Sequence, residues 1–344
     1  MFNLKDLVRA NIWSLKPYSS ARDEFSGDEG VFLDANENPF GTLNRYPDSY
    51  QKELKQKLSA YKNIPTENIF IGNGSDEIID LTYRIFCNPE IDKALTFTPT
   101  FGMYQVASDI NNIELIKLPL DDDFQINVEN LKPYLNDEKL KLIFICSPNN
   151  PTGNCFIEKD IDFILKNFKG IVIIDEAYID FSTTESWLKA LNQFPNLIIT
   201  QTLSKAWALA SARVGIAYAS IEILQLLNKV KMPYNISKLN QQAAIDALDN
   251  ESEFKKNIEV ILNEKEYLIQ KLNQMESVKK IYPSDANFLL VEFDDANKTY
   301  QDLVFQKIIT RNRHMLVNNA IRITVGTPNE NEKLINGLLS ISKY

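Results

Sequence analysis

Residues 171–178 read Ile-Val-Ile-Ile-Asp-Glu-Ala-Tyr, so a short apolar run ends in two acidic residues and a nearby tyrosine. A near-continuous apolar run of this length, bounded by polar residues, is typical of a strand buried on both faces of a sheet. Similar runs occupy residues 141–146, 197–200 and 214–219. Apolar residues also recur at helical spacing in residues 49–62 and 76–87. Together these pieces predict an α/β domain whose central sheet is mostly parallel, with helices on both faces.

The pattern changes after Pro233. Helical spacing covers residues 237–249 and 252–275. The rest of the chain alternates short strands and helices, in segments 287–293, 300–309, 321–325 and 330–341. This alternation of short strands and helices predicts a smaller α+β domain of about a hundred residues. We therefore expect an N-terminal arm that packs with the small domain, a large domain, and a small C-terminal domain, at residues 1–28, 29–235 and 236–344.

The composition excludes several classes of protein. The chain has 344 residues and a net charge of −9, with acidic and basic residues mixed along it, which argues against a nucleic-acid surface. No apolar run approaches the roughly 20 residues that span a bilayer, and the N-terminus lacks the apolar core of a signal peptide. Because His314 is the one histidine, we expect no histidine-rich metal site. The three scattered cysteines, Cys87, Cys146 and Cys155, fit a reducing cytoplasm, where we expect the protein to reside.

Three polar residues fall at or just after the ends of successive predicted strands. Asn150 follows the run 141–146, Asp175 ends the run 171–174, and Lys205 follows the run 197–200. Their separations are each close to one βα unit of roughly 30 residues. Since ligands of open α/β sheets lie beyond the carboxyl ends of the strands, we expect the three side chains to meet in one crevice.

These residue types suit pyridoxal 5′-phosphate (PLP). This cofactor needs a lysine amine to bind its aldehyde and a carboxylate to keep its pyridine nitrogen protonated. Lys205 fits as the amine and also as the base that moves a proton from the substrate Cα, and Asp175 fits as the carboxylate. Asn150 and Tyr178 suit hydrogen bonds to the phenolic oxygen of the cofactor. We expect Lys205, Asp175 and Tyr178 to be catalytic.

The sequence also predicts a binding site for the cofactor phosphate. The turn Gly72-Asn-Gly-Ser-Asp-Glu77 leads directly into a predicted helix, where free N–H groups and the helix dipole favour an anion. Further hydroxyl and guanidinium donors lie close to Lys205 in the sequence. The residues that we expect to bind the phosphate are Gly74, Ser75, Asp76, Thr202, Ser204 and Arg213.

Motifs spread over nearly the whole chain resemble one family. They are Leu15-Lys-Pro-Tyr-Ser-Ser-Ala-Arg22, Leu33-Asp-Ala-Asn-Glu-Asn-Pro39, Asn44-Arg-Tyr-Pro-Asp48, Pro99-Thr-Phe-Gly-Met-Tyr104, Ser147-Pro-Asn-Asn-Pro-Thr-Gly153, Ile174-Asp-Glu-Ala-Tyr178, Thr202-Leu-Ser-Lys-Ala-Trp207, Arg213-Val-Gly215, Met232-Pro-Tyr-Asn235 and Ile321-Arg-Ile-Thr-Val-Gly-Thr-Pro328. With these motifs the chain resembles the fold-type I, class II aminotransferases, and within them the histidinol-phosphate branch.

The resemblance implies a fold-type I PLP-transferase and a homodimer with shared active sites. It implies that Tyr104 stacks on the cofactor ring and that Tyr46 contacts the cofactor phosphate in the other subunit. It also implies that four residues face the substrate: Tyr18, Asn36, Arg311 and Arg322. The implied reaction transfers an amino group between L-histidinol phosphate and 2-oxoglutarate in histidine biosynthesis, and gives imidazole-acetol phosphate and L-glutamate.

The chain departs from the family pattern in places, and alternatives stay open. Phe101 stands where a tyrosine is common, and Ser211 and Ala212 replace a usual glycine and leucine. The segment between Arg311 and Arg322 is short, so Arg313 is an alternative to Arg311. An aromatic aminotransferase and a threonine-phosphate decarboxylase are alternative functions, and a non-catalytic regulatory protein with this fold is a third.

Overall fold

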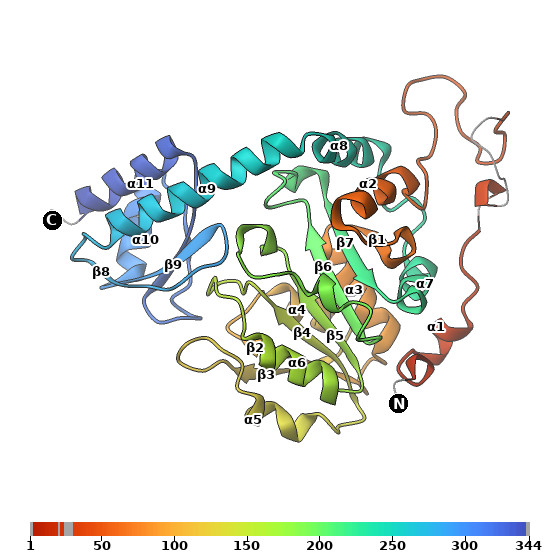
Figure 1. Ribbon diagram of the computed structural model, residues 1–344, viewed down its shortest axis with the longest axis horizontal. Helices are drawn as coiled ribbons and strands as arrows, with labels where there is room; N and C mark the ends of the chain where they lie inside the picture. The colour runs from red at the N-terminus through yellow and green to blue at the C-terminus, as the bar shows by residue number, and fades with distance from the viewer. Residues whose placement is uncertain (1–2, 20, 24–29, 342–344) are drawn as a thin grey trace.

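The computed structural model describes residues 3–19, 21–23 and 30–341, and these form one large and one small β-sheet (Figure 1). The large sheet has the strand order β1-β7-β6-β5-β4-β2-β3, and the small sheet has the order β10-β11-β9-β8. The large-sheet strands are β1 Ile69–Asn73, β2 Lys93–Thr98, β3 Glu114–Pro119, β4 Leu140–Cys146, β5 Ile171–Asp175, β6 Leu197–Thr202 and β7 Val214–Ala219. The small-sheet strands are β8 Val278–Ile281, β9 Phe288–Phe293, β10 Arg311–Asn312 and β11 Ala320–Thr324.

The large sheet is mostly parallel, as predicted. Strand β2 runs parallel to β3 and β4, β4 to β5, and β5 to β6. Strand β7 is antiparallel to both β6 and β1, so the sheet is mixed at one edge. The carboxyl ends of β4, β5 and β6 therefore lie side by side at one edge of the sheet, which is where ligands bind in open α/β folds.

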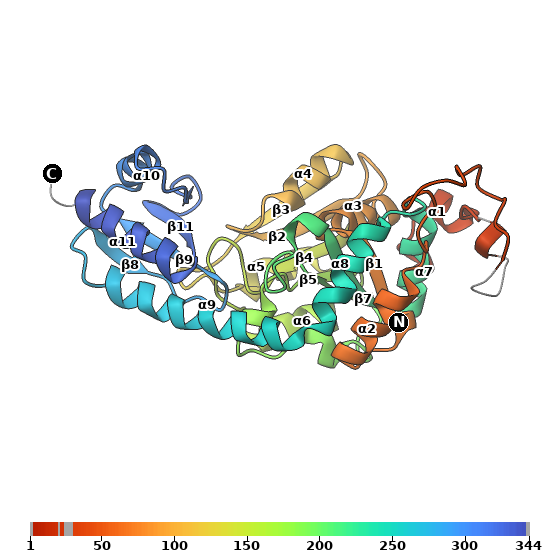
Figure 2. The ribbon, with the colours of Figure 1, turned by 90° about the horizontal axis from the view of Figure 1, so that it is seen from above.

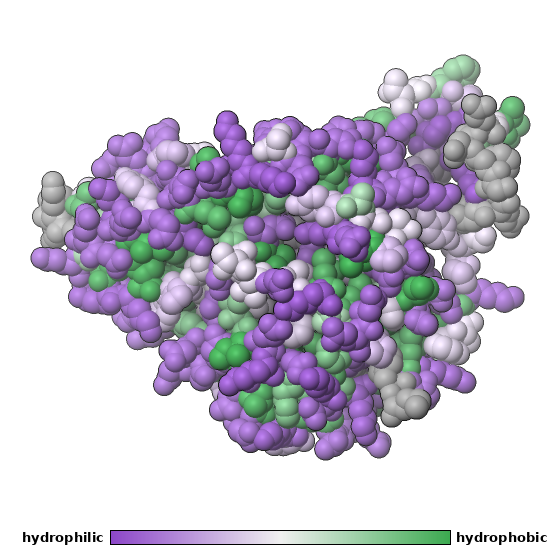
Figure 3. Space-filling view, in the orientation of Figure 1, coloured by the Kyte–Doolittle hydropathy of each residue, from purple (hydrophilic) through white to green (hydrophobic). Residues whose placement is uncertain are grey.

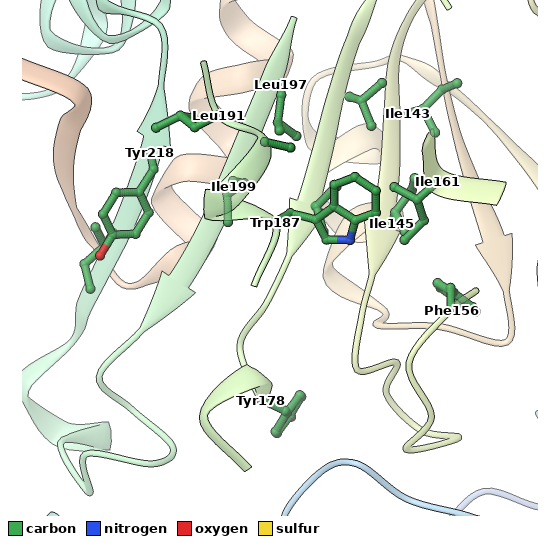
Figure 4. Close-up of a cluster of buried hydrophobic side chains, with 14 of the residues drawn as sticks. Ile143, Ile145, Phe156, Ile161, Tyr178, Trp187, Leu191, Leu197, Ile199 and Tyr218 are labelled. Atoms are coloured by element: carbon green, nitrogen blue, oxygen red, sulfur yellow. The ribbon is translucent and has the colours of Figure 1, made fainter. Parts of the chain in front are cut away.

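Alternate residues of the central strands enter separate hydrophobic clusters on the two faces, as the two-residue period of a strand requires. On one face Ile145, Ile174 and Ile199 belong to a cluster that includes residues of α2, α6 and α8. On the other face Phe144 and Ile173 join residues of α3, α4 and α7. Figure 4 shows strand side chains of the first cluster, with Tyr178 beside the short turn that follows β5. Both faces are thus covered by helices.

The helices lie around both sheets. They are α1 Ala10–Ser14, α2 Lys52–Lys62, α3 Ser75–Phe86, α4 Met103–Ile110, α5 Val128–Leu131, α6 Glu158–Asn167, α7 Ile221–Val230, α8 Lys238–Asp249, α9 Glu251–Leu272, α10 Ala296–Phe305 and α11 Pro328–Ile341. Single turns of 3-10 helix lie at Leu4–Asp6, Ala21–Asp23, Thr66–Asn68, Lys132–Tyr134, Ile179–Phe181, Trp187–Ala190 and Ala210–Ala212. In Figure 2 the long helix α9 runs from beside α8 to the small sheet, and so links the two parts of the molecule.

The small sheet has its own apolar core. Leu272 of α9, Val291 of β9, Ile323 of β11 and Leu338 of α11 are buried in one cluster. The loop before β9 also touches the large part, because the Asp285 N–H donates to the Gly153 carbonyl oxygen over 2.8 Å. The small part is therefore docked onto the loop that carries Asn150.

The N-terminal segment packs differently from the prediction. Val8 and Ile12 belong to the hydrophobic cluster that includes residues of α3 and α7, and Figure 1 shows α1 on the opposite side of the molecule from α11. The Arg9 N–H donates to the Ile85 carbonyl oxygen over 3.0 Å, and Lys229 donates to the carbonyl oxygens of Ile12 and Trp13. The physical reason is that Ile12 is buried against the outer face of these helices. Residues 1–2, 20 and 24–28 of the expected arm lie outside the described residues.

The surface seen in Figure 3 is mostly hydrophilic, with scattered apolar patches. Over the described ranges, no helix combines the length and apolar character that crossing a bilayer requires.

Close backbone approach explains one glycine of β7. A Cβ atom on Gly215 would lie 2.3 Å from the carbonyl carbon of Gly74 and 2.4 Å from the nitrogen of Ser75. Gly74 itself has a φ of +75°, and a Cβ there would lie 2.4 Å from Nη2 of Arg213. Strand β7 and the turn before α3 therefore fit together only because both positions lack a side chain.

We expect Gly215→Ala to lower the free energy of unfolding by about 1–3 kcal/mol, because backbone atoms cannot move aside for the new methyl group. Gly102→Ala is the matched control. Gly102 has a φ of −67° and open space around it, so alanine there should be neutral or stabilising by about 0.4–1 kcal/mol. Urea unfolding midpoints measure both changes. A Gly215→Ala variant as stable as wild type would show that the turn before α3 shifts at little cost.

Candidate active site

Three strand ends meet at one pocket. Asn150 follows β4, Asp175 is the last residue of β5, and Lys205 follows β6. The structure brings these three side chains together. The pocket is lined by Ser75, Asp76, Phe101, Cys146, Asn150, Asp175, Ala177, Tyr178, Thr202, Ser204, Lys205 and Arg213.

Asp175 places a carboxylate at the base of this pocket. The residue is only 2% exposed. Its Oδ2 accepts a hydrogen bond from the Tyr104 hydroxyl over 2.8 Å, and its Oδ1 accepts one from the Ala177 N–H over 3.2 Å. Burial raises the pKa of Asp175, and the bond from Tyr104 acts in the opposite direction. Among the described residues no cation forms an ion pair with this carboxylate, so it is suited to a positively charged ligand atom.

Tyr104 does not have the role that the sequence suggested. Its side chain is fully buried, its ring stacks on Phe144 at 4.9 Å, and its hydroxyl is bonded to Asp175. The ring faces are therefore not available for stacking on a cofactor. Phe101 lines the pocket instead and packs edge-on against Tyr104 at 5.7 Å. The prediction that Tyr104 stacks on the cofactor ring is corrected by this geometry.

Lys205 has few direct partners. Its amine lies 5.8 Å from the centre of the Tyr178 ring, and the described residues form no ion pair with it. The side chain still reaches solvent at the pocket mouth, but the protein surrounds it enough for desolvation to matter. Desolvation lowers the pKa of Lys205, and the positive charges of Arg322 and Arg213 lower it further. More of the amine is therefore uncharged near neutral pH than in a free lysine.

The opposite end of the pocket presents donors around the start of α3. Gly74 precedes the helix without a side-chain cap, so the first N–H groups of the helix are open to a ligand. Arg213 approaches Gly74 and forms a 3.1 Å ion pair with Asp76. Two hydroxyls add to this set, because Thr202 and Ser204 hydrogen-bond each other over 2.9 Å. This end has the donors that a phosphate group requires.

A hydrogen-bonded chain connects the pocket to the small sheet. Arg322 of β11 donates to Oδ1 of Asn150, and Asn150 donates from Nδ2 to the Tyr178 hydroxyl over 3.3 Å. The Arg322 guanidinium also lies over the Phe288 ring at 5.2 Å. Burial raises the pKa of Tyr178, so its hydroxyl keeps its proton and serves as a donor.

The structure does not bring every predicted residue to this pocket. Tyr46 is half exposed and stacks on Tyr234 at 4.5 Å, in a separate hollow that also includes Asn36. Tyr18 is exposed and lines a third hollow. Arg311 lies opposite Arg322 in the small sheet and is exposed.

Phe101 and Cys146 line the pocket and were not predicted to do so. Phe101 follows β2 and Cys146 ends β4. The signal that could have found Phe101 is the one used for the polar residues, namely its position just beyond a strand end. The strand 93–98 was not predicted, so this signal went unused.

The comparisons with known proteins agree with this geometry. The family model described as aminotransferase class I and II matches residues 26–338. The histidinol-phosphate aminotransferase of Parabacteroides distasonis is 50% identical over 98% of this chain and 99% of its own length. The solved histidinol-phosphate aminotransferase of Clostridium acetobutylicum superposes with a TM-score of 0.80 at 24% identity, over 88% of this chain and 91% of that one. A Sinorhizobium meliloti histidinol-phosphate aminotransferase, solved with PLP, has a TM-score of 0.80 at 22% identity, over 88% and 83% of the two chains.

The chain therefore belongs to the class I and II aminotransferase family, and it is an aminotransferase enzyme with the fold-type I architecture. Within that family its relatives at about half identity over the full length place it among the histidinol-phosphate aminotransferases.

We expect Tyr104→Phe to raise the pKa of Asp175, because the variant loses a hydrogen bond that favours the ionised carboxylate. Protonation of Asp175 on acidification should then begin at a higher pH than in wild type. A carboxyl-carbon NMR titration of the two proteins measures this shift.

Tyr83→Phe is the matched control for this variant. Tyr83 is equally buried and donates its hydroxyl to the Tyr104 carbonyl oxygen over 3.0 Å, without contacting Asp175. It should lose stability on the order of 1–3 kcal/mol without moving the Asp175 titration. Identical titrations in wild type and Tyr104→Phe would show that the bond does not tune this carboxylate.

Proposed function

We propose that this enzyme uses PLP to transfer the amino group of L-histidinol phosphate to 2-oxoglutarate, in histidine biosynthesis. The observation that carries the proposal is the pairing of a buried carboxylate, Asp175, with a lysine of lowered pKa, Lys205, in one pocket of an aminotransferase fold. The products are imidazole-acetol phosphate and L-glutamate.

The pocket fits PLP on three counts. Asp175 is a buried carboxylate that pairs with no cation among the described residues, and a protonated pyridine nitrogen would provide a positive charge there. Gly74 leaves a cradle at the start of α3 that any Cβ would fill. Lys205, which lines the same pocket, supplies an amine. When bound, PLP would supply an electron-withdrawing ring and an aldehyde carbon that accepts the amino group.

Each residue around the cofactor would have a separate role. Asp175 would hold the ring nitrogen protonated, and Tyr178 with Asn150 would hydrogen-bond the phenolic oxygen. Lys205, whose pKa is lowered by desolvation and by Arg322 and Arg213, would take the proton from the substrate Cα and pass it to the carbon of the cofactor aldehyde. The N–H groups of α3 and the donors Thr202, Ser204 and Arg213 would bind the phosphate. Phe101 would cover the ring in place of Tyr104.

The substrate anion would meet the small sheet. Arg311 and Arg322 face each other across β10 and β11, and the planar guanidinium binds phosphate bidentately. A phosphate monoester carries nearly two negative charges near neutral pH, which two arginines offset. Tyr18 and Asn36 are the other residues that we propose for the substrate.

We also propose a homodimer in the cytoplasm. Tyr46 and Asn36 lie away from the Lys205 pocket of their own chain, so they are free to complete the site of a second subunit. The Tyr46 N–H donates to Glu37 over 2.6 Å, and Glu37 also pairs with Arg22 and Arg45. Burial alone would raise the pKa of Glu37, but hydrogen bonds from these partners, led by Arg45, outweigh it and lower the pKa to about 2. Tyr46 thus sits on a fixed loop.

A donor panel tests the function. We expect fast conversion of L-histidinol phosphate with 2-oxoglutarate, slower transfer from L-phenylalanine or L-tyrosine, and no decarboxylation of L-threonine phosphate. Lys205→Ala should be inactive with every donor, because no other described residue that lines the pocket is a lysine. The measurements are glutamate release and carbon dioxide release. A preference for the aromatic donors would move the assignment to an aromatic aminotransferase, and carbon dioxide release would move it to a decarboxylase.

Mixed dimers test the shared site. Lys205→Ala and Tyr46→Ala subunits, each nearly inactive alone, should regain about a quarter of wild-type activity after random exchange, because half of the dimers then hold one intact site. The control mixes Lys205→Ala with Asp175→Asn, whose residues line one pocket of the same chain, and should regain nothing. Recovery in the control alone, or in neither mixture, would contradict the proposed placement of Tyr46.

A further inference from the structure

The loop that carries Asn150 is held on one side by the segment between β8 and β9. The Asp285 N–H donates to the Gly153 carbonyl oxygen over 2.8 Å, and Oδ2 of Asp285 accepts a hydrogen bond from the Cys155 N–H over 2.8 Å. Gly153 has a φ of +90°, and a Cβ atom there would lie 2.6 Å from Oγ of Ser284. The two segments therefore meet at close backbone distance, and the loop relies on Asp285 for two of its backbone hydrogen bonds.

A buried lysine fixes the backbone on both sides of Asp285. The Lys265 amine of α9 donates to the Ser284 carbonyl oxygen over 2.8 Å and to the Ala286 carbonyl oxygen over 3.3 Å. Desolvation lowers the pKa of Lys265, and the negative charge of Asp285 acts in the opposite direction. Burying a cation is costly, and the two carbonyl bonds together with the nearby Asp285 charge offset that cost. Segment 284–286 is therefore fixed relative to α9.

The same part of the chain also supports the second residue that we propose for the phenolic oxygen of the cofactor. Phe288, the first residue of β9, packs edge-on against the Tyr178 ring with 5.1 Å between the ring centres. The Ser284 hydroxyl donates to the Phe288 carbonyl oxygen over 2.6 Å. The Tyr178 hydroxyl accepts a hydrogen bond from Nδ2 of Asn150 over 3.3 Å. Segment 284–288 therefore contacts both the loop of Asn150 and the ring of Tyr178.

We propose that Asp285 is a positioning residue, which holds loop 149–155 in place so that Asn150 can donate to the phenolic oxygen of the bound cofactor. The inference rests on the proposed function, which gives Asn150 that role, and deepens it. Asp285 is not among the described residues that line the Lys205 pocket, so it acts through the loop and not on the cofactor. Lys265 supports it by holding segment 284–286.

The first test measures, in holoenzyme, the pH at which the absorbance of the bound cofactor changes. A donor to the phenolic oxygen favours its ionised form, so a displaced Asn150 should raise this pH. We expect a rise of about 0.5–1 unit in Asp285→Ala, because complete loss of a hydrogen bond to a charged group corresponds to about one to two units. Asp285→Asn keeps an acceptor for the Cys155 N–H and should restore most of the wild-type value.

Steady-state kinetics should follow the same order of variants. With L-histidinol phosphate and 2-oxoglutarate, we expect kcat to fall about three- to tenfold in Asp285→Ala, whereas KM for the donor should change less than about twofold. The reason is that the variant disturbs the residue beside the cofactor without removing a contact to the donor. Asp285→Asn should recover most of the kcat.

A double-mutant cycle separates positioning from a general loss of stability. In Asn150→Ala the amide no longer exists, so the added Asp285→Ala change should shift the cofactor titration by less than about 0.3 unit. Asp295→Ala is the matched control, because Asp295 also accepts a backbone N–H, that of Lys298 over 2.9 Å, at the start of α10. This control should keep the wild-type titration and the wild-type kcat.

Hydrogen exchange in the full-length protein without cofactor gives a readout that does not depend on the reaction. In Asp285→Ala the Cys155 N–H loses its acceptor. The Gly153 N–H, which donates to the Asn149 carbonyl oxygen over 2.7 Å, should also open more often once the loop is released. We expect amides of segment 149–155 to exchange on the order of tenfold faster in Asp285→Ala than in wild type, Asp285→Asn or Asp295→Ala.

Three results would overturn the proposal: an unchanged cofactor titration in Asp285→Ala, a shift of equal size with and without Asn150, or an unchanged exchange rate in segment 149–155. Failure of the proposed function looks different. In that case wild type itself would not convert L-histidinol phosphate, whereas the cofactor titration and hydrogen exchange would still decide whether Asp285 positions the loop of Asn150.

Discussion

Asp175 is the last residue of β5, whose other residues are all apolar and buried. The fold therefore places a buried carboxylate at the carboxyl end of a central strand. A buried charge is costly unless hydrogen bonds and an opposite charge compensate it. Tyr104 and the Ala177 N–H provide two donors, and the pocket side stays open for a cation. Strands β4 and β6 run parallel to β5 on either side of it. Asn150 and Lys205, which follow these two strands, therefore lie at the same edge of the sheet as the Asp175 carboxylate.

Much of the fold could be predicted because the central strands are buried on both faces, which makes their apolar runs continuous. Strands β4, β5, β6 and β7 lie where the runs 141–146, 171–174, 197–200 and 214–219 indicated. The edge strand β3 was missed, since its sequence Glu114–Pro119 mixes exposed polar and partly buried residues. The antiparallel direction of β7 can be explained from the connection that precedes it. Its connection to β6 is short and contains no crossover helix, which a parallel pair would require.

The residues of the candidate site also fall into those that the sequence located and those that it did not. Residues placed by strand ends, such as Asp175 and Lys205, could be located from spacing alone. Phe101 and Tyr104 could not be told apart by sequence, because they lie three residues apart around the start of α4. The direction in which that helix begins decides which ring faces the pocket and which is buried against Phe144. Arg313 was no easier to assign, because its surroundings come from a hollow built by the large sheet and the small sheet together.

The positive charges of the site act on each other as well as on ligands. Arg213 and Arg322 both lower the pKa of Lys205, and both are also donors suited to phosphate groups. An anion bound to either arginine cancels part of its field at the lysine amine, so the pKa of Lys205 rises toward its usual value as the site fills. The fraction of uncharged amine is therefore larger in the free enzyme, where the amine reacts with an aldehyde, than in the filled site. The same arginines therefore influence the protonation of Lys205 and carry donors suited to an anion.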